Sequence, residues 1–208
     1  IAVEPKGAAC LKASLEAGKV VTVPNINTIA DGTAVQTPGD KLFPYLQQNV
    51  DEVLTIDDSE LTLSFLDMAE NHKMIVENSG LLTVAALKHL NFKGKKLVSV
   101  LSGGNMDVLT MATVVQNGLI LRDRIFTLSV MLPDKPGQLA DVSALIAKLQ
   151  GNVIKLEHNV FANVNRAAGV QLTITMESFG TEHKEQIVNA LRDAGYSPVL
   201  ERTSAAYF

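Results

Sequence analysis

The pattern of apolar residues changes near residue 124, and this change divides the chain into two folding problems. Before it, short apolar runs alternate with helical stretches, which is typical of a parallel α/β sheet with right-handed crossovers. After it, four strand-like runs and two helical stretches follow in the order βαββαβ, a ferredoxin-like arrangement. The charged segment Arg122-Asp123-Arg124 reads as the boundary. We therefore expect one domain over residues 1–121 and another over residues 125–203.

Composition limits the classes of function. The chain of 208 residues has a formal net charge of -4, and its basic residues are scattered, so nothing predicts a nucleic-acid partner. The only cysteine, Cys10, excludes an internal disulfide and fits a reducing compartment, and we expect a cytoplasmic protein. The longest apolar runs fall far short of the ~20 residues that a membrane-spanning helix needs, so no membrane partner is predicted.

Turn and capping residues mark the elements of the first half. Asp57 followed by Glu60 is a capping box that opens a helix, and residues 24–38 form an unusually long loop of the kind that often carries function. Gly118 is expected to end the last helix. Strands are predicted at residues 1–3, 19–23, 52–56, 74–76 and 96–101, and helices at 7–17, 39–49, 57–72, 79–90 (capped by Ser79) and 107–117.

The second half is predicted in the same way. It contains an amphipathic helix and a helix capped by Thr181, and between them lie strand-like runs in which apolar and polar residues alternate. Strands are predicted at residues 126–132, 152–161, 169–176 and 197–201, helices at 138–149 and 181–194, and turns at 134–137 and 163–166.

The turn Ser102-Gly103-Gly104-Asn105 follows an apolar run and precedes a helix. Its glycines let the backbone approach a bound group, and the N-terminus of the next helix offers N–H donors. Such a turn is common in α/β proteins, and its significance comes from three accompanying segments. These are Val3-Glu4-Pro5, Ala30-Asp31-Gly32 and Glu77-Asn78-Ser79-Gly80. In a parallel sheet, Glu4, Glu77 and Ser102 would all lie at the carboxyl ends of strands, where ligands bind.

In this order, the four segments resemble the second half of the catalytic domain of fold-type II pyridoxal-phosphate enzymes. The closest resemblance is to the threonine dehydratases (threonine ammonia-lyases), with serine racemases and serine dehydratases as relatives. It implies a parallel-sheet remnant of that catalytic domain, with pyridoxal phosphate as cofactor. The implied reaction is β-elimination, which converts L-threonine to 2-oxobutanoate and ammonia.

The resemblance also implies motifs that this chain lacks. Members of the family carry a cofactor-binding lysine, a Ser-Gly-Asn turn and a glycine-rich phosphate cup upstream of the point that matches Ile1. We therefore expect a C-terminal fragment that, by itself, neither retains pyridoxal phosphate tightly nor turns over threonine.

The family pattern assigns roles to four residues. The hydroxyl of Ser102 would face the pyridine nitrogen, and a neutral partner there suits β-elimination better than transamination. Glu77 would lie near the cofactor ring and a water molecule as the catalytic carboxylate, while Gly32 and Gly103 would approach the cofactor through their backbone. Simpler interpretations stay open: Ser102 could cap a helix, Glu77 could interact with a helix dipole, and Gly32 could be an ordinary turn glycine.

Glu4 and the carbonyl of Ala8 match two ligand positions of a cation site that some relatives contain. The third side-chain position, an aspartate in serine racemases, is Cys10 here. Magnesium or calcium, which prefer oxygen ligands, is therefore disfavoured, and a monovalent ion held by carbonyls stays open.

The segment from about residue 126 to 200 resembles an ACT domain, the amino-acid-sensing module. Asp134 and Asn152 match positions that contact a free amino acid across a dimer interface, which implies a homo-oligomer with isoleucine or valine as effector. Turn chemistry for Asp134 and a strand-edge position for Asn152 are the simpler interpretations. An alternative function follows: this chain would act only as an amino-acid-binding, dimerising regulatory module. A second alternative is that the chain is part of a relative of the serine dehydratases or serine racemases.

Overall fold

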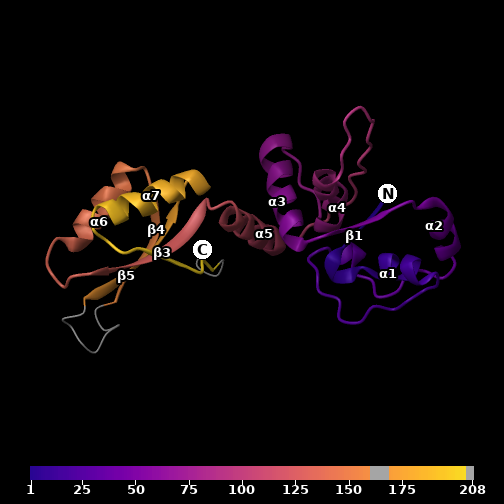
Figure 1. Ribbon diagram of the computed structural model, residues 1–208, viewed down its shortest axis with the longest axis horizontal. Coiled ribbons are helices and arrows are strands. Elements are labelled where there is room, and N and C mark those ends of the chain that lie inside the picture. The colour runs from indigo at the N-terminus through magenta and orange to yellow at the C-terminus, as the bar shows by residue number, and fades with distance from the viewer. Residues whose placement is uncertain (160–168, 205–208) are drawn as a thin grey trace. The chain divides into compact units, whose positions relative to one another are not determined.

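A computed structural model describes residues 1–159 and 169–204, and the chain in it divides into two compact units, residues 1–118 and 119–208. Figure 1 shows the helices and strands of each unit. The turn predicted at residues 163–166 lies outside the described residues. No helix among those described is both long and apolar enough to cross a membrane.

Unit 1 contains the predicted parallel pairing. Strands β1 (Ala2–Pro5) and β2 (Val53–Ile56) pair in parallel, from Ala2 opposite Val53 to Pro5 opposite Ile56. Ile56, Leu61, Phe65 and Leu81 are fully buried in the core of this unit. The helices and helical turns are η1 (Lys6–Ala8), α1 (Cys10–Ala17), η2 (Asp31–Thr33), α2 (Phe43–Asn49), α3 (Asp58–Asp67), η3 (Met68–His72), η4 (Asn78–Leu81), α4 (Leu82–Ala85), η5 (Ala86–His89) and α5 (Val108–Leu121).

Local signals set several of these boundaries. The capping box before α3 is confirmed, with the Asp57 N–H donating to Glu60 Oε2 at 3.1 Å. The helical run over residues 78–89 is also confirmed, although Glu77 is its N-cap and not Ser79. The prediction that Gly118 ends a helix is wrong, because α5 continues to Leu121. A Cβ at Gly118 would lie 2.6 Å from Leu66 Cδ1, so this glycine permits close packing instead of ending the helix.

Three predicted strands do not form. Residues 19–23, 74–76 and 96–101 belong to no ladder within the described chain. A strand requires a neighbour that satisfies its backbone groups along its length. The backbone bonds of these described segments are isolated ones, such as the Met74 N–H to the Met68 carbonyl at 3.1 Å and the Val23 N–H to the Gln36 carbonyl at 2.9 Å.

Unit 2 has the predicted βαββαβ order. Its antiparallel sheet has the strand order β4-β5-β3-β6, that of the ferredoxin-like fold, and helices α6 and α7 cover one face (Figure 1). Leu128, Ile174, Ile146 and Leu191 are buried between the sheet and the helices. The elements are β3 (Ile125–Leu132), α6 (Gln138–Lys148), β4 (Asn152–Asn159), β5 (Val170–Glu177), α7 (Thr181–Asp193) and β6 (Val199–Glu201).

The turn before β3 is bonded to the start of α7, and we call this set of contacts the Asp123 clasp. Thr181 Oγ1 donates to Asp123 Oδ2 at 2.8 Å and Lys184 Nζ donates to Asp123 Oδ1 at 2.7 Å. The Ser178 hydroxyl donates to the Asp123 carbonyl. Gly180 is the N-cap of α7, so the prediction that Thr181 caps this helix is wrong. The clasp holds the chain at its entry into the sheet.

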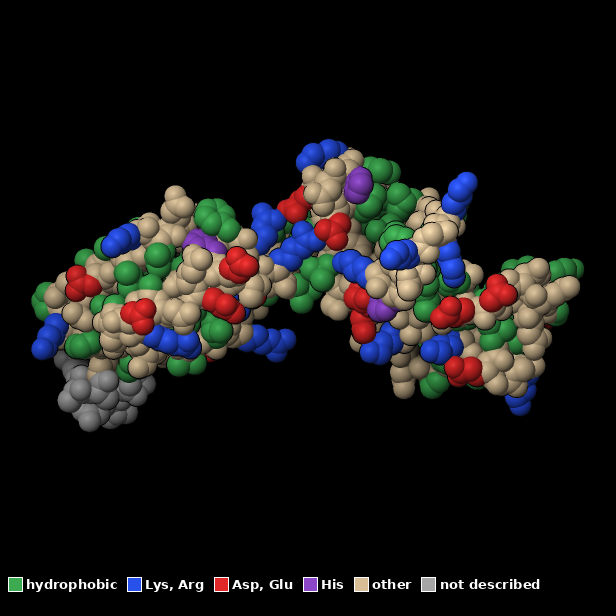
Figure 2. Space-filling model, turned by 45° about the horizontal axis from the view of Figure 1, so that its top comes forward, with side chains coloured by type: hydrophobic (Ala, Val, Ile, Leu, Met, Phe, Trp, Pro, Cys, Tyr) green, Lys and Arg blue, Asp and Glu red, His purple; other side chains and the backbone are tan. Residues whose placement is uncertain are grey.

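Acidic and basic side chains are interspersed on the face that Figure 2 shows. This face presents no continuous basic surface, in keeping with the net charge of -4.

Candidate functional site

The site in unit 1 is a hollow around Glu77, a half-buried residue at the N-cap of η4. Its volume is about 260 Å³. Three separate parts of the chain meet there: the loop at residues 29–32, the start of η4, and the segment leading into α5. The lining residues are Ile29, Asp31, Gly32, Glu77, Asn78, Ser79, Asn105, Met106, Asp107 and Thr110.

Two polar side chains hold the long loop against this hollow. Asp58, in the first turn of α3, accepts the Thr28 hydroxyl at 2.7 Å and the Ile29 N–H at 3.0 Å. The side-chain amide of Asn78 donates to the Ile29 carbonyl at 3.0 Å. The loop is thereby fixed just before η2, where a Cβ on Gly32 would lie 3.3 Å from Glu77 Oε1. Gly32 therefore contacts the edge of the hollow through its backbone.

Gly103 lies directly against Glu77. Its φ is +76°, and a Cβ there would be 2.0 Å from Glu77 Cδ. A Cβ on Gly80 would be 1.7 Å from the Ser102 carbonyl oxygen. A Cβ at Gly80 would require a shift of the Ser102 backbone, and a Cβ at Gly103 would require the Glu77 side chain or the backbone to move. The structure thus brings together Glu77, Gly103 and Gly32, which lie far apart in the sequence.

Ser102 is placed differently. It is exposed and does not line the hollow, and its backbone packs on Gly80. Its contact with a pyridine nitrogen stays a prediction. Asp107, which sequence reasoning did not single out, lines the hollow and accepts the Thr110 N–H at 2.9 Å. That N–H, more than any other group, holds the pKa of the Asp107 carboxyl below its ordinary value.

The residues of the hollow fit the ring of pyridoxal phosphate and not its phosphate. A Cβ at Gly32 would lie 3.0 Å from Ser79 Oγ and 3.3 Å from Glu77 Oε1, so a glycine here keeps the edge of the hollow beside Glu77 open to a flat ring. The carbonyl oxygen of the Asn78 side chain is buried without a hydrogen-bond partner, so it is available to a donor on a ligand. No lysine or arginine lines this hollow, whereas its lining includes three carboxylates, from Asp31, Glu77 and Asp107. A phosphate dianion would be repelled there.

Glu4 acts on the N-terminus of α1. Its carboxylate is buried and accepts the Leu11 N–H at 3.0 Å and the Lys12 N–H at 2.8 Å. Burial raises the pKa of this carboxyl, while the two N–H groups act in the opposite direction. Within the described residues no group of three or more His, Cys, Asp or Glu side chains could hold a metal ion. The cation site at Glu4 and Ala8 stays a prediction.

Replacing Glu4 with glutamine should destabilise unit 1 by about 1 kcal/mol, because one of the two helical N–H groups would then face an amide NH2. Glu16→Gln is the control, since Glu16 is exposed on the same helix. Urea unfolding followed by circular dichroism would measure both variants. Equal midpoints for the two would contradict the capping role of Glu4.

In unit 2 the two predicted effector residues lie at opposite ends of the sheet. Asp134 is exposed in the turn after β3, beyond Leu132. Asn152 begins β4 beside Glu177, which is opposite Ile125 at the other end of β3. An eight-residue strand separates these ends by about 23 Å. A single small ligand cannot touch Asp134 and Asn152 of one chain, although it could touch one residue from each of two chains.

Comparison with known proteins gives the same two-part division. Residues 1–103 match the family described as "Pyridoxal-phosphate dependent enzyme", and residues 126–196 match the "ACT domain". The chain is 36% identical over 198 residues to an L-threonine ammonia-lyase of Geobacter sulfurreducens, covering 94% of this chain and 49% of that protein. An L-threonine ammonia-lyase of Thermotoga maritima is 32% identical over 197 residues, which cover 94% of this chain and 49% of that protein.

The chain thus spans about half the length of the curated relatives it matches. Among solved structures, the processed form of threonine deaminase isoform 2 from Solanum lycopersicum aligns with a TM-score of 0.51 and 28% identity, over 55% of this chain and 35% of that one. Both units of the chain therefore have counterparts in known proteins.

Proposed function

Because residues 1–103 belong to the pyridoxal-phosphate-dependent enzyme family and residues 126–196 form an ACT domain, we propose that the chain is part of a threonine ammonia-lyase regulated by an amino acid. One observation carries this proposal: the similarity to L-threonine ammonia-lyases runs through both units and covers 94% of the chain. The proposed reaction converts L-threonine to 2-oxobutanoate and ammonia.

Four residues in or near the hollow would each have a definite task. Pyridoxal phosphate, when bound, supplies the electron sink that makes the proton on the substrate α-carbon acidic. Gly32 and Gly103 would approach the cofactor through their backbone. Glu77 Oε1 would hold the water molecule beside the ring. Ser102 would offer the ring nitrogen a neutral hydroxyl, as the family resemblance implies.

The test is a chimaera in which this chain replaces the matching half of the Geobacter sulfurreducens enzyme. We expect the chimaera to release 2-oxobutanoate from L-threonine. L-serine is assayed in parallel, because a preference for L-serine would indicate a serine dehydratase or serine racemase relative. A folded chimaera that binds pyridoxal phosphate but acts on neither amino acid would contradict the proposal.

We also propose that the polypeptide of 208 residues alone neither retains pyridoxal phosphate nor turns over threonine. The support is the lining of the hollow, which has three carboxylates and no lysine. The measurement is the absorption spectrum after incubation with the cofactor and gel filtration. A retained cofactor band, or any 2-oxobutanoate produced, would overturn this prediction.

Unit 2 is proposed to sense isoleucine or valine as part of a homo-oligomer. The support is the separation of Asp134 and Asn152, since an effector touching both requires two copies. Calorimetric titration of the chain with either amino acid should give heat. A flat titration together with a monomeric mass would count against this part.

The single cysteine, Cys10, supports a proposed cytoplasmic location.

A further inference from the structure

Three consecutive polar residues at the start of η4 line the hollow of unit 1: Glu77, Asn78 and Ser79. The sequence predicts that Ser79 caps a helix, but Glu77 occupies the cap position, so the Ser79 hydroxyl has no capping task. We propose that the Ser79 hydroxyl and the Glu77 carboxylate together bind one O–H group of a small molecule in the hollow. This assignment rests on the proposed function, to whose site it adds Ser79.

The polar groups of these three residues lack partners. The Glu77 carboxylate and the Ser79 hydroxyl are half-buried, and neither forms a hydrogen bond or an ion pair within the part of the chain that the structure describes. The side-chain carbonyl oxygen of Asn78 is buried and is also unpaired among those residues. Polar groups that are withdrawn from water ordinarily have a hydrogen-bond partner in the protein. Three neighbouring exceptions indicate groups that are kept for a ligand.

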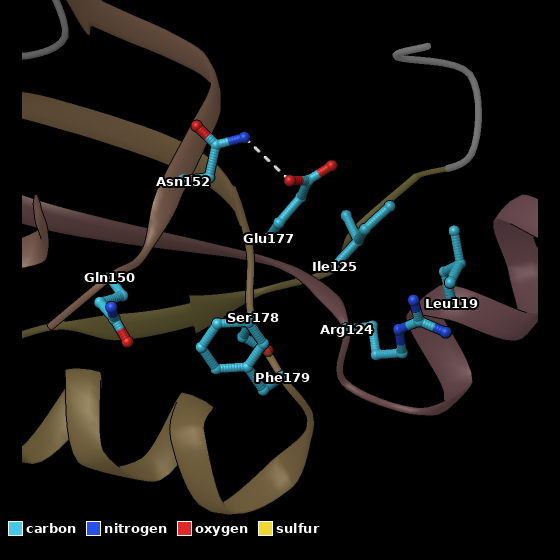
Figure 3. A pocket seen from close by; sticks show the side chains of 8 residues that line it. All are labelled: Leu119, Arg124, Ile125, Gln150, Asn152, Glu177, Ser178 and Phe179. Atoms are coloured by element: carbon cyan, nitrogen blue, oxygen red, sulfur yellow. Dashed lines mark hydrogen bonds between the residues drawn. The ribbon is translucent and has the colours of Figure 1, made fainter.

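The pocket at one end of the sheet in unit 2 differs in this respect. In Figure 3 the Asn152 amide donates to Glu177 Oε2 at 2.8 Å, so this carboxylate is already paired within the chain. Both residues are also exposed, and water can satisfy their remaining groups. This pair is thus satisfied without a ligand, unlike Glu77 and Ser79.

The position of Gly32 shows that the two groups at η4 face the same point. A Cβ at Gly32 would lie 3.0 Å from Ser79 Oγ and 3.3 Å from Glu77 Oε1. Because glycine has no Cβ, the space between the loop and these two oxygen atoms stays open. The Asn78 amide holds the loop by donating to the Ile29 carbonyl at 3.0 Å. The opening is therefore bounded by backbone that is fixed in place.

The two oxygen-bearing groups are complementary to a hydroxyl. A carboxylate only accepts hydrogen bonds, whereas a serine hydroxyl can also donate one. An alcohol or a water molecule between them would donate its hydrogen to Glu77 and accept the hydrogen of Ser79. Asp31 and Asp107 add two further carboxylates to the lining, and Thr110 donates both its N–H and its hydroxyl to Asp107. Ser79 is thus one of the few donors that the hollow offers to a ligand.

Two molecules of the proposed reaction carry such an O–H group. One is L-threonine, through the hydroxyl on its β-carbon, and the other is water. Binding of the substrate hydroxyl would make Ser79 a specificity-determining residue, because a site built to bind a hydroxyl rejects an analogue that lacks it. Binding of water would make Ser79 a positioning residue for the water molecule beside Glu77.

Ser79→Ala in the chimaera with the Geobacter sulfurreducens half tests the assignment. Three quantities are measured: KM for L-threonine, the inhibition constant of L-2-aminobutyrate, which lacks the hydroxyl, and the absorption maximum of the bound cofactor. If Ser79 binds the substrate hydroxyl, KM should rise about tenfold while the inhibition constant stays unchanged. If Ser79 holds the water molecule, the absorption maximum should shift while the ratio of the two constants stays unchanged. Three unchanged quantities, or an equal loss for both amino acids with an unshifted maximum, would overturn the assignment.

Ser59→Ala is the matched control, because Ser59 is an exposed serine of α3 outside the hollow. It should leave all three quantities unchanged. Both variants of the 208-residue chain should also keep the parent midpoint in urea, since the Ser79 hydroxyl has no hydrogen bond to lose within the described residues. A lower midpoint for Ser79→Ala alone would show a structural role and would overturn the assignment.

The outcomes separate this assignment from the proposed function. If the parent chimaera is folded and binds pyridoxal phosphate but acts on neither L-threonine nor L-serine, the proposed function fails and the assignment falls with it. If the parent chimaera is active and Ser79→Ala matches it in all three quantities, the assignment alone fails and the lyase proposal stands.

Discussion

Gly103→Ala is expected to destabilise unit 1 by about 2–5 kcal/mol. A residue with a Cβ at φ +76° costs about 1–2 kcal/mol in backbone strain. The new Cβ would also fall 2.0 Å from Glu77 Cδ, so Glu77 or the backbone must move, and such overpacking costs about 1–3 kcal/mol. The same shift would displace the carboxylate from the hollow.

Gly104→Ala is the matched control. A Cβ at Gly104 would have only the Ile75 carbonyl oxygen within reach, at 4.0 Å, and this glycine has no positive φ. We expect a change within about 0.5 kcal/mol. Urea unfolding by circular dichroism compares the two variants, and equal midpoints would contradict the close contact between Gly103 and Glu77.

Asp123→Asn is expected to destabilise unit 2 by about 1–2 kcal/mol at neutral pH. Asparagine tolerates the φ of +54° at this position and keeps an acceptor for Thr181, but it loses the charge that pairs with Lys184. The Lys184 side chain is only 19% exposed, so water replaces that partner incompletely. Asp141→Asn, at an exposed position of α6, is the control and should change stability little.

The effect of Asp123→Asn should depend on pH. Burial acts to raise the pKa of the Asp123 carboxyl, but hydrogen bonds from Lys184 and Thr181 and the charge of Lys184 together lower it below its ordinary 3.8. A lowered pKa in the folded state means that the stabilisation is complete above the ordinary value and is lost as the pH falls through the folded value. The difference between wild-type and variant unfolding midpoints should therefore shrink below about pH 4. A difference between the midpoints that is constant with pH would show that the charge of Asp123 is not the source of the stabilisation.

Local signals predicted those elements whose boundaries depend on neighbouring residues. The Asp57 and Glu60 capping box, for example, depends on residues three apart. The βαββαβ order likewise follows from the apolar period of each segment in turn. The strands expected at residues 74–76 and 96–101 failed because a ladder depends on a distant neighbour, and residue patterns do not reveal whether one is available. Gly118 was misread because its packing partner, Leu66, is distant in sequence.

The same distinction holds for the candidate sites. Turn chemistry and the family resemblance led to Glu77, Gly32 and Gly103, which the structure brings together. The contacts that Asp58 and Asn78 make with the loop were missed, because they join segments that are 29 and 49 residues apart.

We propose that the hollow beside Glu77 forms one wall of a pyridoxal-phosphate site. The absorption band of cofactor bound to the chimaera with the Geobacter sulfurreducens half tests it most directly, measured for the parent, Gly103→Ala and Gly104→Ala proteins. The parent and Gly104→Ala proteins should retain the band, whereas Gly103→Ala should lose it while still folded by circular dichroism. Equal cofactor bands in all three proteins would contradict it.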